Sequence, residues 1–250
     1  MSENVEKGQM ALYPEGVEYY DPENCACDSV ATSFLMYKVG APRDFWYPSA
    51  IDTISGRKPG QPTDSHAVFR NLLALLEKGA EIVELCPFES ERLKREGLAY
   101  VEEFCSDSWL KEDPASFYNY WGSGNLELFT EAYANFDDRV RNDFKSSYQT
   151  IHRSAEIADI RQYIAEGYAA KCILKSNRGA GISHAVVVTD IDPPGLYDGV
   201  DVFDPNLARR AGLQGPIVSR DIGDFTEKWM PAEGTFAVRR FDPNQNTAAI

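Results

Sequence analysis

Apolar residues recur at helical spacing directly after a polar lead-in near residue 20. The lead-in, residues 19–23, contains proline and acidic residues, and Val30 and Phe34 belong to the apolar run that follows it. Gly40 closes this run, and glycine is the usual residue just past a helix end. The pattern therefore predicts a helix that starts near Cys27 and ends at Gly40.

The remainder of the first half is also mainly helical in pattern. Residues 66–79 have Asp64-Ser65 at their start and Gly79 at their end, which are helix start and stop signals. The other expected elements up to residue 145 are a short helix at 48–54, a strand at 80–86 and mainly helix over 89–145.

From about residue 147 the pattern changes to short strands. The segment 184–192 is rich in β-branched residues and is too apolar for anything but a central strand. The other elements expected here are strands at 148–151, 169–174, 199–206 and 233–241, a helix at 156–165 and a short helix at 225–230.

Helices and strands are thus segregated along the chain, which is typical of the α+β class. We expect a single domain over residues 1–250, a length that suits one domain with two subdomains. A mainly helical subdomain, about 17–145, would carry the Cys27 helix and pack on an antiparallel β-sheet subdomain, about 147–242. A cleft between them would bring the Cys27 helix against the sheet.

Composition excludes several classes of function. The net charge is -14, and lysines and arginines are scattered, so a nucleic-acid partner is not expected. The acidity favours a basic or amine-bearing partner. No apolar run reaches about 18 residues, so no membrane span is expected. Residues 1–7 are polar and acidic, which is unlike a signal peptide.

The five cysteines predict a reducing, cytoplasmic location. Their number is odd and their spacing irregular, which argues against a disulfide framework; they are Cys25, Cys27, Cys86, Cys105 and Cys172. Cys25 and Cys27 form a CxC pair, but no second pair stands at zinc-site spacing. No metal and no cofactor is therefore expected.

Three residues on separate elements form a candidate catalytic set. Cys27 stands at a helix N-terminus, where the helix dipole favours the thiolate. His184 begins the central strand, and Asp204 ends the next one, so a thiol, a base and an orienting carboxylate can meet. Taken singly, Cys27 can be a small core residue, His184 a strand-capping histidine and Asp204 part of a turn. His66 and His152 lie on expected helical segments and are interpreted as surface or boundary residues.

With these elements in this order, the chain resembles the papain-like cysteine peptidases of the bacteriocin leader-processing group. The specific signals are the 13-residue spacing from Cys27 to Gly40, the apolar strand after His184 and the Asp-Pro at 204–205. The resemblance implies a papain-like α+β fold, with Cys27 as nucleophile, His184 as base and Asp204 as orienting acid. It covers residues 20–40 and 155–240 well and the segment between them only in outline.

Two positions depart from the family pattern. The family usually has glycine after the nucleophile, where this chain has Asp28. It also has a glutamine six residues before the nucleophile, which donates to the oxyanion; here that position is Asp21. Asn24 is the alternative amide donor for an oxyanion hole. Cys25 is the rival nucleophile, but it lies on the loop side of Cys27.

The leading hypothesis is a thiol hydrolase that cleaves a peptide or amide bond through an acyl-enzyme on Cys27, with a basic substrate favoured by the acidity of the chain. Two alternatives keep the fold. One is an acyltransferase that passes an acyl group from a thioester to an amine. The other is a non-catalytic binding module, suggested by Asp21 in place of glutamine. Substrate identity and oligomeric state are left open.

Overall fold

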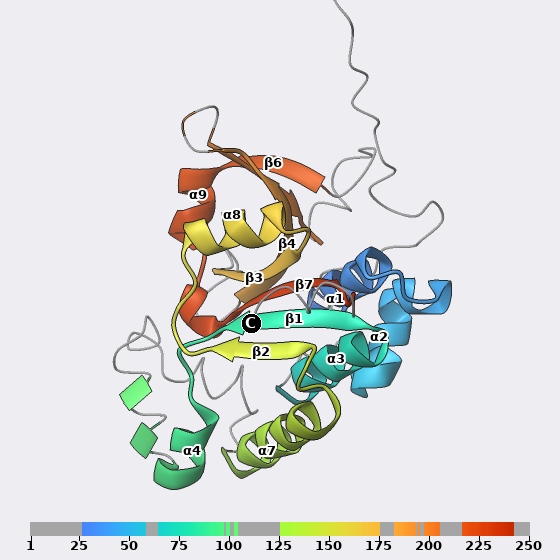
Figure 1. Cartoon of the computed structure of the whole chain (residues 1–250), viewed down its shortest axis with the longest axis vertical. Helices are drawn as coiled ribbons and strands as arrows, with labels where there is room; N and C mark the ends of the chain where they lie inside the picture. The colour runs from blue at the N-terminus through green and yellow to red at the C-terminus, as the bar shows by residue number, and fades with distance from the viewer. Residues whose placement is uncertain are drawn as a thin grey trace, which may run out of the picture.

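A computed structural model describes residues 27–58, 65–97, 99–100, 103–104, 126–175, 183–193, 195, 198–205 and 217–242. The fold is α+β and contains one seven-stranded sheet in the order β2-β1-β7-β3-β4-β5-β6 (Figure 1). The strands are β1 (Ala80–Leu85), β2 (Tyr148–Ile151), β3 (Ala169–Lys175), β4 (Ser183–Ile191), β5 (Gly199–Phe203), β6 (Ile217–Asp221) and β7 (Thr235–Arg240).

The sheet is mostly antiparallel. Every neighbouring pair of strands runs antiparallel except β1 and β2, which are parallel. A purely antiparallel sheet was expected, so the β1–β2 pair differs from that expectation. The strand β1 also comes from the mainly helical half of the chain, yet it lies inside the sheet between β2 and β7. The two halves of the sequence therefore share one sheet.

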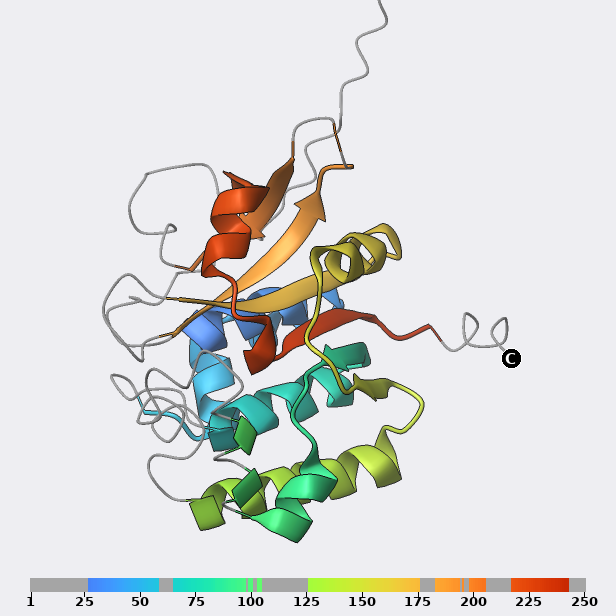
Figure 2. The same cartoon turned by 90° about the vertical axis from the view of Figure 1, so that its left-hand side faces the viewer.

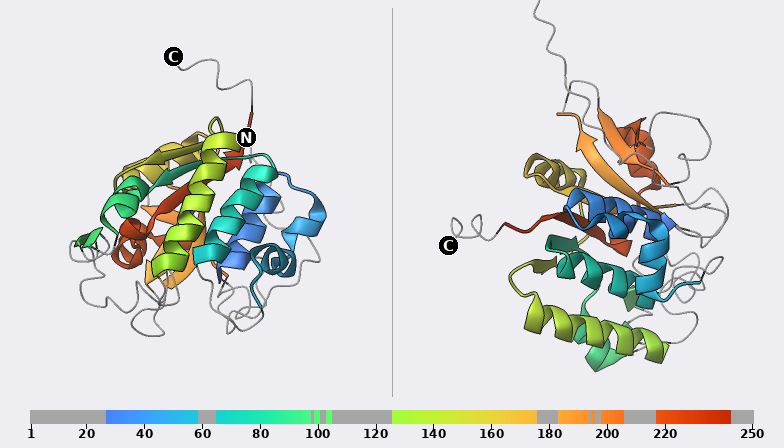
Figure 3. Two further views of the ribbon diagram at one scale, coloured as in Figure 1. Left: turned by 90° about the horizontal axis from the view of Figure 1, so that it is seen from below. Right: turned by 90° about the vertical axis from the view of Figure 1, so that its right-hand side faces the viewer.

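Helices cover both faces of this sheet. They are α1 (Cys27–Lys38), α2 (Pro48–Ser55), α3 (Ser65–Glu77), α4 (Ser90–Glu96), α7 (Leu126–Asp143), α8 (Ile157–Ala165) and α9 (Ile222–Lys228), with short 3₁₀ turns η2 (Arg43–Trp46) and η4 (Pro231–Glu233). On one face, α1, α3 and α7 lie side by side, as the left panel of Figure 3 shows. On the other, α8 packs over β3 and β4, and α9 packs over β5 and β6 (Figure 2).

The central strand β4 shows how alternation builds two cores. Ala185 and Val187 point into the core with α1 and α3, whereas Val186 and Val188 point into the core with α8 and α9. Successive side chains of a strand point to opposite faces, so a strand covered on both faces has to be apolar throughout. This explains the continuous apolar run in the sequence.

Helix α1 is buried almost all round, including its polar side chains. It packs against α2, α3, β4, β3 and β7, and the ring of Phe34 stacks on that of Phe203 with centroids 4.2 Å apart. Gly40 ends the segment with φ 73°, and the Ala41 N–H reaches the Met36 carbonyl at 2.9 Å. The expected glycine stop is confirmed by this left-handed turn.

The structure confirms most expected elements and adds one strand. The helices expected at 48–54, 66–79 and 156–165 correspond to α2, α3 and α8, and each expected strand is present. Strand β6 was missed because its five residues alternate too weakly to stand out. No helix in the described ranges is long and apolar enough to span a bilayer.

Candidate active site

The three residues of the candidate set meet at one end of the sheet. Cys27 is the first residue of α1, His184 is the second residue of β4, and Asp204 directly follows β5. Because β4 and β5 are antiparallel neighbours, the start of one lies beside the end of the other. The packing of α1 on β4 then brings the helix N-terminus to the same place.

His184 and Asp204 form a direct, buried hydrogen bond. The distance between Nε2 of His184 and Oδ1 of Asp204 is 2.7 Å, and the two residues are 8% and 3% exposed. Val187 lies opposite Phe203, so the same register places Asp204 opposite Val186 and diagonal to His184. Diagonal neighbours on one face of an antiparallel pair are within reach of long side chains.

The thiol of Cys27 is hydrogen-bonded to the imidazole of His184. Since Nε2 of His184 is bound to Asp204, Nδ1 is the ring nitrogen left for the thiol. The backbone N–H of Ala185 donates to the same sulfur. Cys27 itself is partly exposed. The structure thus brings together the three side chains for which the sequence suggested the roles of nucleophile, base and orienting carboxylate.

The electrostatics of this pair favour charge separation. Burial alone raises the pKa of the Cys27 thiol, but the hydrogen bond and charge of His184 and the Ala185 N–H outweigh it, so the net pKa is lowered. Burial lowers the pKa of His184, but its bonds to Asp204 and Cys27 raise it to about 9. The two shifts have opposite signs, and both favour a thiolate beside an imidazolium over the neutral pair.

Arg220 is a further residue at this site that sequence reasoning missed. Its guanidinium, on β6, donates to Oδ2 of Asp204, while Oδ1 is bound to His184. Both oxygens of the carboxylate are therefore fixed. The alternation at 217–221 was the only signal in the sequence, and it gave no indication of this pairing.

Two buried ion pairs hold the first turn of α1. Asp28, next to Cys27, pairs with Lys171 of β3 and accepts a 2.7 Å hydrogen bond from Asn71 of α3. Ser29 donates to Asp52 of α2 at 2.5 Å. Asp52 in turn pairs with Arg57, whose Nε lies 2.7 Å from Oδ1 of the carboxylate. The start of α1 is thereby tied to three neighbouring elements.

Other residues considered from sequence are not part of this arrangement. Asp21, Asn24, Cys25 and Cys105 lie outside the described residues. His66 belongs to α3, as expected. The helical placement of His152 was wrong: it follows strand β2 and is exposed, with Nδ1 3.3 Å from the Phe88 carbonyl. Its surface placement is correct.

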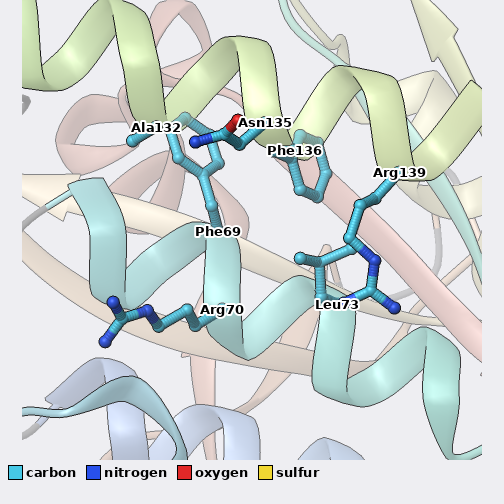
Figure 4. A pocket seen from close by; sticks show the side chains of 7 residues that line it. All are labelled: Phe69, Arg70, Leu73, Ala132, Asn135, Phe136 and Arg139. Carbon is cyan, nitrogen blue, oxygen red and sulfur yellow. The ribbon is translucent and has the colours of Figure 1, made fainter.

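A surface pocket of about 280 Å³ lies elsewhere, between α3 and α7. Figure 4 shows its seven side chains, which come from those two helices alone: Phe69, Arg70, Leu73, Ala132, Asn135, Phe136 and Arg139. They include no cysteine, serine or histidine. Within the described part of the chain, no three His, Cys, Asp or Glu side chains are grouped so that they could hold a metal ion.

Neither a protein-family model nor the sequence of a curated protein matches this chain.

Proposed function

We propose that this protein is a thiol hydrolase of papain-like type, which cleaves a peptide or amide bond through an acyl-enzyme on Cys27. The observation that carries the proposal is the buried chain of contacts from the Cys27 thiol through His184 to Asp204. A nucleophile bonded to a base, which is in turn oriented by a third group, is the geometry that nucleophilic catalysis requires.

Acylation begins from the thiolate and imidazolium. The Cys27 sulfur attacks the carbonyl carbon of the scissile bond. The negative charge that develops on the carbonyl oxygen needs amide donors, and the N–H of Cys27 is suited because a helix leaves its first N–H groups without intrahelical acceptors. The imidazolium of His184 protonates the leaving amine from Nδ1, the carbon–nitrogen bond breaks, and a thioester on Cys27 remains.

Deacylation reverses the proton transfer. Neutral His184 accepts a proton from water at Nδ1, and the hydroxide attacks the thioester carbonyl. The carbon–sulfur bond breaks, the acid product leaves, and the thiolate and imidazolium are restored. Throughout, Asp204 holds Nε2 of His184, which fixes the tautomer and stabilises the imidazolium.

The first experiment is acyl trapping. The protein is treated with a nitrophenyl ester of an N-blocked amino acid at pH 7, and the acylated peptides are mapped by mass spectrometry. We expect an acyl group on Cys27 and a burst of nitrophenol, both absent in Cys27→Ala. Cys172→Ala is the matched control, because it removes a thiol buried in β3, and it should keep the burst.

The outcome also separates the rival functions. Slow loss of the acyl group to water supports a hydrolase, whereas loss only after addition of a free amine supports an acyltransferase. A Cys27 that acquires no acyl group, in protein whose circular dichroism shows the native fold, contradicts both and favours a non-catalytic binding module.

A further inference from the structure

The residue after the candidate nucleophile is an acid buried at 5% exposure, which is an unusual neighbour for a thiol that should ionise. The charge of Asp28 raises the pKa of Cys27. A negative charge close to a thiol disfavours the thiolate, so this side chain works against the chemistry unless its charge is offset.

Lys171 supplies that offset from the sheet. It lies on the face of β3 that packs toward α1, between Ala169 and Ile173, and is only 2% exposed. Its ammonium is bound to Oδ1 of Asp28, and Asn71 donates to Oδ2 at 2.7 Å. Both carboxylate oxygens of Asp28 are therefore occupied by donors from two other elements.

We propose that the Asp28–Lys171 pair is a positioning device for the reactive thiol: it anchors the first turn of α1 on the sheet and cancels the carboxylate charge beside Cys27. This inference rests on the proposed function of Cys27. The strand β3 that carries Lys171 is hydrogen-bonded to β4, which carries His184. The pair therefore links the helix of the nucleophile to the sheet that presents the base.

Stability alone does not account for such a pair. Burying two charges costs desolvation energy that their attraction only roughly offsets, so an apolar pair of similar volume is often as stable. Fixing the register between two elements is the better-attested use of a buried polar pair. Here that register is the placement of Cys27 against His184.

Other charged groups surround the start of α1, and the test has to leave them unchanged. Those linked to it by direct contacts are His184 on β4, Asp204 after β5, Arg220 on β6, and Asp52 with Arg57 beside Ser29. Two further arginines lie beside the C-terminal ends of α2 and α1. Arg70 of α3 donates to the last residue of α2, and Arg240 of β7 approaches Gly40, past the far end of α1.

The experiment compares the pH dependence of Cys27 alkylation by iodoacetamide in four proteins, read by peptide mass mapping. Lys171→Met keeps the length of the side chain but leaves Asp28 unpaired, so the midpoint should move to higher pH and the rate at pH 6 should fall about tenfold. Asp28→Asn leaves the ammonium alone, so the midpoint should move to lower pH. The double variant should return close to the wild-type midpoint.

The opposite signs distinguish charge compensation from loosened packing. A purely structural role would move the midpoint of both single variants toward that of an ordinary thiol, and this result would overturn the inference. If Lys171→Met does not fold, as judged by circular dichroism, the Asp28→Asn and double variants still provide the comparison. An ordinary thiol midpoint for Cys27 in the wild type would instead contradict the proposed function.

Discussion

Cys27 and Cys86 both lie next to buried carboxylates, and their surroundings have opposite effects on the thiol. At Cys27 the charge of Asp28 is met by Lys171, and His184 adds a hydrogen bond and a positive charge. At Cys86 the neighbouring acids are Glu84 and Glu233, and burial together with these acids raises the pKa of the thiol. Cys86 is therefore expected to remain an unreactive thiol.

The acids near Cys86 also differ from Asp28, the acid next to Cys27, because Asp28 is bound to a cation. Tyr148 and Thr150 donate hydroxyl hydrogen bonds to Glu84, yet burial keeps its pKa raised. Glu233 is 4% exposed, its Oε2 has no hydrogen-bond partner among the described residues, and burial raises its pKa to about 8. A buried acid without a cation takes up a proton, whereas one bound to a cation can stay charged.

The largest expected effect comes from removing the imidazole. In His184→Ala, Cys27 should lose the interactions that lower its pKa, and its alkylation rate at pH 6.5 should fall by about 50-fold. Peptide mapping of the same sample gives Cys86 and Cys172 as internal references. His152→Ala, which removes an exposed imidazole, is the matched control. An unchanged alkylation rate of Cys27 in His184→Ala would contradict the view that His184 makes Cys27 more reactive than Cys86.

The second effect tests the region around Cys86. Because the pKa of Glu233 is higher in the folded protein, about 8, than the 4.5 of a free side chain, its favourable contribution to folding is complete below pH 4.5 and is lost as pH rises through 8. Relative to wild type, Glu233→Gln should gain about 3 kcal/mol in unfolding free energy between pH 5 and pH 7.5. Urea unfolding at both pH values measures this, and a difference that does not change with pH would be the contrary result.

A third and smaller effect concerns the orienting acid. Asp204→Asn removes the carboxylate that raises the pKa of His184, so the thiolate and imidazolium should coexist over a narrower pH range. We expect about a tenfold slower alkylation of Cys27 at pH 7.5. Asp201→Asn is a matched control, because Asp201 lies on β5, which Asp204 directly follows, and it accepts a hydrogen bond from Ser219 instead. Equal alkylation rates in the two variants would show that Asp204 does not influence the reactivity of Cys27.

The smallest effect separates stability from electrostatics. Gly40→Ala forces a non-glycine residue into φ 73° at the far end of α1, which should lower the unfolding free energy by about 1 kcal/mol. The alkylation midpoint of Cys27 should stay at the wild-type value, because no charged group near the thiol is altered. A shifted midpoint would mean that the contrast between the two thiols depends on global stability.

The sequence was informative where a local pattern carries the structure. The apolar run ending at Gly40 predicted α1, and the order of Cys27, His184 and Asp204 on their elements predicted the observed contacts. Ion pairs that depend on the register between strands and helices could not be predicted from the sequence. Nothing in the residues near Arg220 or Lys171 indicates that their cations meet Asp204 and Asp28, because these contacts join strands and helices far apart in the chain.

The position of β7 also has a consequence for the order of assembly during synthesis. This strand lies between β1 and β3 and pairs Ala80 with Arg240, so the sheet stays in two pieces until residues near 240 leave the ribosome. Contacts of such long sequence separation form slowly and late. Helix α1, which packs on β7 as well as on β3 and β4, gains its complete support only then. A nascent chain that lacks β7 would therefore lack part of the support of α1, and the surroundings of the Cys27 helix would be complete only with the finished sheet.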